Sequence, residues 1–216
     1  MPSSRVWPQL RCGLASLLCS TLLLNGCQAF LNNQYSASVA PERGVVHLKG
    51  LGQSAEIRRN PLGIPLIESG SSHDSLFALG YVHASDRLSQ MIGMRLMAEG
   101  RLAEMAGPGV IEIDRFMRAV NLKKSAHTLY QNTSPQMQKV LEVYSRGVNA
   151  YLFQYRDQLP MDLAASGYRP AYWQPEDSLL VFSLLNFSLA MNLQEEITTL
   201  VMAQKVGAEQ IAWLTP

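Results

Sequence analysis

The chain has 216 residues, a formal net charge of +1 and 47% hydrophobic residues. The near-neutral charge gives no reason to expect nucleic-acid binding, and the hydrophobic content is typical of a globular domain. The three cysteines, Cys12, Cys19 and Cys27, all lie near the N-terminus. The rest of the chain therefore has no thiol for a disulfide or a cysteine-based metal site.

The N-terminus has the pattern of an export signal. Arg5 and Arg11 supply positive charge, and the apolar run over 12–24 is too short for a comfortable membrane span. We expect residues 1–26 to be removed. Because Arg5 and Arg11 are the only charges in that stretch, the mature chain would carry a net charge near −1.

The end of this signal is Leu24-Asn25-Gly26-Cys27, with a Leu three residues before the Cys. It resembles the lipobox of bacterial lipoproteins, in which the Cys is acylated. We therefore expect lipidation at Cys27 and a periplasmic protein anchored at a membrane surface. Gln28, where an Asp would retain the protein at the inner membrane, favours the outer membrane. An ordinary signal peptide that contains a Cys is the alternative.

Residues 27–43 are polar and rich in small residues, which indicates a tether, and they leave 44–216 as the domain. Three short strands are expected at its start. The candidates are 44–50, 55–59 and 64–68, with a turn at Asn60-Pro61-Leu62-Gly63 between the last two. Pro65 places the third strand at an edge or at its own start.

The rest of the chain has helical patterns. Ser72 and Asp74 are the candidate N-caps of the first helix, and Pro135 follows a candidate cap at Ser134. The expected helices cover 72–84, 86–105, 111–122, 134–152, 176–191 and 194–206, with a further turn over 208–214. Gly107-Pro108-Gly109 is expected to end the second helix, and 168–177 to be an aromatic and Pro-rich linker.

The expected fold is therefore mostly α, with a few short N-terminal strands. Three strands without later partners make a poor sheet, because both edges stay unpaired. This pattern favours a sheet that is completed by something outside this sequence. A small sheet capped by helices is the alternative.

No self-contained catalytic motif is present in the sequence. The chain has no Gly-rich phosphate loop, HExxH, zinc spacing or G-x-S-x-G, and its histidines share no motif. His83 and Asp86 stand three residues apart on an expected helix, which favours a packed His near a helix-capping Asp over half of a catalytic or metal site. We also expect three structural ion pairs: Asp86–Arg87, Arg95–Glu99 and Arg101–Glu104.

Three blocks in the chain resemble a known family when taken together and in order. The first is Gly63-Ile64-Pro65 after Arg58 and Arg59. The second is Asp74, the block GYVHASDRLSQM at 80–91 and Gly100-Arg101-Leu102-Ala103-Glu104, followed by Gly107, Asp114 and Arg118. The third is Arg169-Pro170, Trp173, Pro175, Glu176-Asp177-Ser178-Leu179, Glu196, Leu200 and Gly207. Over 45–214 they resemble the small, N-terminal subunit of the penicillin acylase (penicillin amidase) family, and within it the acyl-homoserine-lactone acylases.

The resemblance implies the small-subunit part of an αββα N-terminal-nucleophile hydrolase, whose sheet is completed by a large subunit. It also implies a calcium ion between the subunits, with Glu196 as the ligand from this chain; neighbouring Glu195 leaves the register open by one residue. One Glu cannot make a calcium site alone. A pair of acidic residues in the first turn of a helix is the structural alternative.

By the same resemblance, the segment 179–192 corresponds to the lining of the acyl pocket. The residues expected to face an acyl chain are Phe182, Leu185, Asn186, Phe187, Leu189 and Met191. An apolar lining gains roughly 0.8 kcal/mol per buried CH₂ and favours long fatty acyl groups. A plain core helix is the alternative.

In the family, a Ser at the start of the large subunit is the nucleophile, and it is released when one precursor is cut. We therefore expect no catalytic residue in this chain and no activity from it alone. The expected function is that of part of a precursor for an acyl-homoserine-lactone acylase, a quorum-quenching amidohydrolase. The alternatives are a subunit of a β-lactam or other amide acylase, and a non-catalytic lipoprotein binding module. Because no linker peptide precedes the end at Pro216, we expect a fragment, a separately encoded part or a trimmed subunit.

Overall fold

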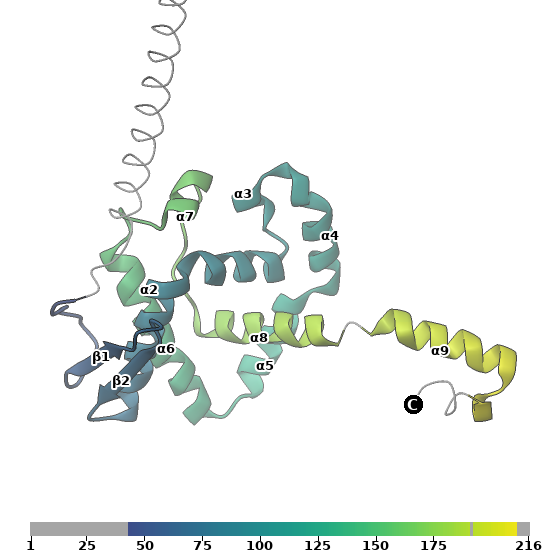
Figure 1. Ribbon diagram of the computed structural model, residues 1–216, viewed down its shortest axis with the longest axis horizontal. Coiled ribbons are helices and arrows are strands. Elements are labelled where there is room, and N and C mark those ends of the chain that lie inside the picture. Colours follow the sequence, from purple (N-terminus) through teal and green to yellow (C-terminus); the bar gives the residue numbers. More distant parts are fainter. Residues whose placement is uncertain (1–42, 191, 211–216) are drawn as a thin grey trace, which may run out of the picture.

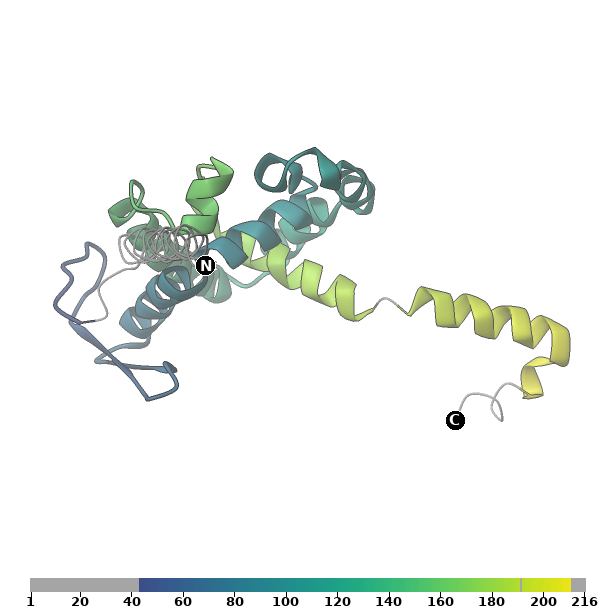
Figure 2. The same ribbon diagram turned by 45° about the horizontal axis from the view of Figure 1, so that its top comes forward.

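The structure is a computed structural model that describes residues 43–190 and 192–210. Helices pack into one body behind a β-hairpin, and the last long helix projects away from that body (Figure 1, Figure 2). The expected signal peptide, the tether up to residue 42, Cys27 and Met191 lie outside the described residues. Within them, no helical stretch combines the length and hydrophobicity that crossing a bilayer requires.

The hairpin consists of β1 (Ala55–Arg59) and β2 (Pro65–Ser69), which pair antiparallel with Ile57 opposite Ile67. The predicted turn is confirmed: the Asn60 side chain accepts hydrogen bonds from the backbone N–H groups of Leu62 and Ile64. The prediction of a strand over 44–50 is wrong, since the segment forms only an isolated bridge, between Lys49 and Leu51. A strand needs a neighbour with free backbone groups, and in the described residues that segment pairs with neither hairpin strand.

The first helix, α2 (Ser72–Glu99), is one element where the sequence indicated two. The backbone leaves helical geometry only at Arg87, with φ −141° and ψ 24°, so the predicted break is a kink. The N-cap is Ser71, whose side chain accepts from the Asp74 N–H at 3.1 Å; the prediction of Ser72 or Asp74 as the cap is wrong. The helix ends at Gly100, in the left-handed region at φ 66°, and not at Met105 as expected.

Two helices were not expected from the sequence. The left-handed backbone of Asn121 separates α4 (Ile111–Val120) from α5 (Leu122–Asn132), and only Leu122 and Ala126 of α5 are buried, so its apolar pattern is weak. Six-residue α7 (Met161–Ser166) is too short to show a period. The other elements are α3 (Ala103–Ala106), η1 (Pro108–Val110), α6 (Pro135–Gln154), α8 (Pro175–Leu189), α9 (Leu193–Val206) and η2 (Ala208–Gln210).

The core forms where α2 crosses α6. The backbones approach closely there, because a Cβ added to Gly80 would lie 2.1 Å from the carbonyl oxygen of Tyr144. Buried side chains of α2, α6, α7 and the segment before α8 form the first core cluster: Ala84, Leu88, Ile92, Leu96, Val148, Tyr151, Leu152, Leu163 and Trp173. A second cluster joins the end of α2 to α4, α5 and α8.

Candidate functional site

The entry into α8 is fixed by a buried ion pair. Arg95 of α2 lies 3.0 Å from the Asp177 carboxylate, and both residues are buried. Burial raises the pKa of Asp177, while the backbone N–H of Gln174 and the Arg95 guanidinium oppose that rise. The expected Arg95–Glu99 pair is wrong. Glu99 instead pairs with Arg101 and Lys123, because Arg95 points to the side of α2 that α8 covers.

The segment before α8 is held from a second side by α6. The Asn149 side chain bonds both backbone groups of Trp173, donating to its carbonyl at 2.9 Å and accepting from its N–H at 2.7 Å. The Trp173 indole N–H donates to the Ser178 hydroxyl at 3.0 Å. The linker expected over 168–177 is thus well anchored at its end, and Pro175 opens α8 at the first helical position.

The exposed face of α8 carries four of the five described residues that were expected to face an acyl chain. Leu180 and Leu184 point into the second core cluster. On the open side are Phe182 (53% exposed), Leu185 (48%), Leu189 (78%) and Asn186. Phe187 lies apart from them, half-buried against that cluster, with its ring centroid 6.2 Å from that of Phe116 on α4. The plain-core alternative therefore describes Phe187, while the other four form one open face.

Glu196 lies on α9, a helix none of whose residues is buried and which projects from the body (Figure 2). Its carboxylate accepts a hydrogen bond from the Asn192 amide at 2.9 Å. Around it Leu193, Leu200 and Ile197 are exposed. In the described part of the chain, no three His, Cys, Asp or Glu side chains group as a metal site requires. The residues present fit the role of one carboxylate ligand, not of a whole calcium site.

His83 and Asp86 do not form a pair. His83 Nδ1 lies 3.0 Å from the Tyr144 hydroxyl, and burial lowers the pKa of His83. Asp86 binds the Arg59 guanidinium through both oxygens, at 2.5 and 2.9 Å, which ties the hairpin to α2. Asp86 is therefore neither a helix cap nor the partner of Arg87, and both predictions are wrong. The Arg101–Glu104 pair is confirmed at 2.7 Å.

Asp74 has a structural role that the sequence did not indicate. It is buried, and its carboxylate accepts from the backbone N–H groups of Gly52 and Gln53 at 2.8 and 3.1 Å. These bonds, with others from His73 and Ser71, lower its pKa to about 2. Asp74 thus fastens the segment before the hairpin to the first turn of α2. No local pattern could reveal this, since the partners are 21 and 22 positions away.

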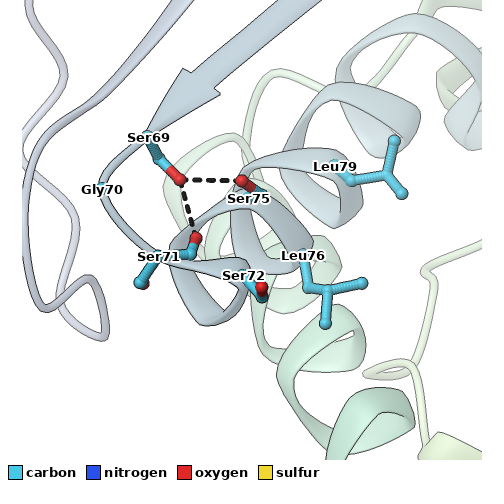
Figure 3. Close-up of a pocket in the computed structure, with 7 residues that line it drawn as sticks. All are labelled: Ser69, Gly70, Ser71, Ser72, Ser75, Leu76 and Leu79. Carbon is cyan, nitrogen blue, oxygen red and sulfur yellow. Dashed lines mark hydrogen bonds between the residues drawn. The ribbon is translucent and has the colours of Figure 1, made fainter.

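Two surface hollows lie away from α8. One, of about 590 Å³, is an open depression at the start of α2, where Leu76 and Leu79 flank a group of serines (Figure 3). The Ser69 hydroxyl is engaged there with the Ser75 hydroxyl and the Ser71 carbonyl. The other, of about 250 Å³, is lined by Arg156, Arg169 and Tyr172, among others. Neither of these two hollows is lined by a residue of α8.

Comparisons with known proteins agree on one family. Residues 54–216 match the family model described as penicillin amidase. The chain is 64% identical, over 95% of its length, to the acyl-homoserine lactone acylase QuiP of Pseudomonas aeruginosa, and 58% identical to that of Pseudomonas syringae. Among solved structures it resembles a thermostable penicillin G acylase from Alcaligenes faecalis, with a TM-score of 0.58 and 25% identity over 76% of this chain and 90% of that one. The chain spans about a quarter of the length of these curated relatives, 24% and 25%.

Proposed function

This chain belongs to the penicillin amidase family, and from that we propose that it is the small-subunit part of an exported acylase that hydrolyses N-acyl-homoserine lactones. The products would be a fatty acid and homoserine lactone, and the process quorum quenching. The observation that carries the substrate class is the 64% identity to a protein named acyl-homoserine lactone acylase, against 25% to a penicillin G acylase.

The reacting groups of the proposed enzyme lie outside this chain. An N-terminal Ser of the large subunit would attack the amide carbonyl, with its own α-amino group accepting the hydroxyl proton. The C–N bond breaks, the amine leaves with that proton, and water hydrolyses the resulting ester. The present chain would supply part of the acyl-binding surface, through Phe182, Leu185 and Leu189.

We propose that the large subunit packs along an apolar stripe that runs from α8 onto α9, and that the acyl chain lies between the two subunits at the α8 part of the stripe. Its members are Phe182, Leu185, Leu189, Leu193, Ile197, Leu200 and Val201, all of them exposed. Their spacing of mostly three or four residues continues across the break between the helices. The occupant is argued from length, since the chain spans only about a quarter of its curated relatives. We also propose that large-subunit strands complete the sheet beside the hairpin.

A calcium ion at this interface is part of the proposal, with Glu196 as the ligand. In a helix, successive residues are rotated by about 100°, so Glu196 projects within about 60° of Leu193 and Leu200, whereas Glu195 projects to the opposite side. Docking on the apolar stripe would take water from the Glu196 carboxylate and favour a cation beside it. The large subunit would supply the remaining oxygen ligands.

The cellular location is proposed from the sequence alone. A lipid on Cys27 would hold the enzyme at the periplasmic face of the outer membrane, and residues up to 43 would act as the tether. Palmitate labelling of the wild type and of Cys27→Ala tests this part separately.

The first experiment is to read the coding DNA beyond the codon of Pro216. The proposal expects an open frame that leads to a Ser-initiated chain of several hundred residues. The second step assays the processed product on long-chain acyl-homoserine lactones and on phenylacetyl amides. Preference for phenylacetyl amides would replace the proposed substrate with that of a penicillin-type acylase. A stop codon with no partner gene nearby would leave only a non-catalytic binding module.

A further inference from the structure

We propose that Arg95 is a positioning residue that sets the axial position and rotation of α8, and through it the acyl-binding face; this rests on the proposed function. Arg95 touches no residue of that face. It acts from α2, and all its polar contacts are with the segment that leads into α8 or with the first turn of α8.

The guanidinium contacts four residues, all of them within 171–177. Nη1 donates to the Asp177 carboxylate at 3.0 Å and to the Tyr172 carbonyl at 3.3 Å, and Nη2 donates to the Ala171 carbonyl at 3.2 Å. The guanidinium carbon also lies 5.4 Å from the centre of the Trp173 ring. A planar fork with five N–H groups can satisfy these acceptors together, which the point charge of a Lys cannot.

The contacts that hold the rest of α8 are of another kind. Leu180 and Leu184 pack in the apolar cluster with Leu122 and Ala126 of α5. Apolar burial is non-directional, so it holds the helix against α5 without strictly fixing its rotation or its position along its axis. The bonds from Arg95 to Asp177, in the first turn of α8, are directional and do fix both.

The acyl-binding face that the Arg95–Asp177 contact would position begins five residues after Asp177, with Phe182. From there to Leu189 the open side of α8 has only exposed residues, so nothing in the described chain holds it from that side. A misplacement of about 1 Å, even from a change remote from the chemistry, can cost roughly 100-fold in rate. Loosening the first turn should therefore change how well different acyl chains fit, and not only how much protein folds.

The test uses the complete, processed enzyme and a series of acyl-homoserine lactones of increasing chain length. Arg95→Lys keeps the charge but loses the fork. Arg95→Met/Asp177→Leu removes both charges, so that no buried charge is left unpaired. Asp74→Asn is the matched control. Asp74 is also a buried charge on α2, but its hydrogen bonds are to Gly52 and Gln53 and to its neighbours Ser71 and His73, and none is to α8.

We expect Arg95→Lys and the double variant to raise KM for the best substrate by about tenfold and to flatten the chain-length preference, with kcat per titrated active site changed less. Asp74→Asn should lower the active fraction and leave the preference unchanged. The proposal fails if both Arg95 variants keep the wild-type preference, or if Asp74→Asn flattens it as well.

A measurement without substrate distinguishes failure of the positioning role of Arg95 from failure of the proposed function. Backbone amide exchange over 175–189 should be faster in Arg95→Lys than in Asp74→Asn. If the wild type hydrolyses no acyl-homoserine lactone, the proposed function falls, and this exchange still decides whether Arg95 positions α8. Equal exchange in the two variants would overturn that role.

Discussion

Gly147 of α6 lies against the backbone of Phe77 of α2, so closely that a Cβ atom on it would be 1.9 Å from the Phe77 carbonyl oxygen. Gly80 of α2 makes the reciprocal approach to Tyr144 of α6. The two helices therefore cross with their backbones almost in contact. This crossing explains why the Gly80-Tyr81 motif begins with a glycine: no side chain fits there.

Gly147→Ala should destabilise the fold, because the methyl group meets backbone atoms that cannot rotate away. Overpacking of this kind costs about 1–3 kcal/mol and occasionally more, and we expect the upper end of that range. The measurement is urea denaturation followed by circular dichroism. Gly109→Ala is the control, since nothing lies within 4 Å of its Cβ position, and its effect should stay within about 0.5 kcal/mol. Equal stability of the two variants would contradict the crossing.

The low pKa of Asp74, about 2, predicts an acid-sensitive contribution to stability. The pKa is lower in the folded state than the unfolded value near 3.8, so the contribution is complete above about pH 4 and is lost as the pH falls toward 2. Asp74→Asn should lower the thermal midpoint at pH 7, and the gap to the wild type should narrow between pH 4 and pH 2. Midpoints recorded across that range check this, and a gap of constant size would refute the linkage.

Calcium should stabilise the proposed two-subunit enzyme in a way that depends on Glu196. At a free calcium concentration of 100 times Kd the stabilisation would be about 2.7 kcal/mol, and a chelator should remove it. Glu196→Gln should abolish the effect. Glu195→Gln, a neighbouring residue on the far side of α9, should keep it. Thermal melts with calcium or with a chelator measure this stabilisation. If only Glu195→Gln loses it, the calcium ligand is Glu195.

Phe182→Ala should weaken the use of long acyl chains. Each methylene that is no longer buried costs roughly 0.8 kcal/mol, which is about fourfold in kcat/KM, so the loss should grow with chain length. Phe153→Ala, on α6, removes another exposed ring away from the open face of α8 and should leave the chain-length preference unchanged. Values of kcat/KM for acyl-homoserine lactones of increasing chain length measure the effect of both variants. A uniform loss at all lengths would argue against acyl contact by Phe182.

The helix starts that the sequence predicted best are those with a local chemical signal. Ser134 is the N-cap of α6 and Pro135 its first residue, and Pro175 is likewise the first residue of α8. The Asn60–Gly63 turn is equally local, because the Asn60 side chain bonds backbone groups two and four residues on. Where the ordering of the chain depends on neighbours within one turn, residue types alone suffice.

Tertiary structure decided what the local pattern could not. Arg95 has an acidic residue four positions on, yet it pairs with Asp177, 82 positions away, because α8 covers that side of α2. Likewise the residues expected in one acyl-binding segment divide between an open face and the core, since Phe187 packs against the second core cluster while Phe182, Leu185 and Leu189 stay exposed. The sequence by itself determined the starts of α6 and α8, the turn of the hairpin and the family. Which charges meet, which face of α8 stays open and how closely α2 and α6 approach depended on long-range packing, which residue types at short spacing do not encode.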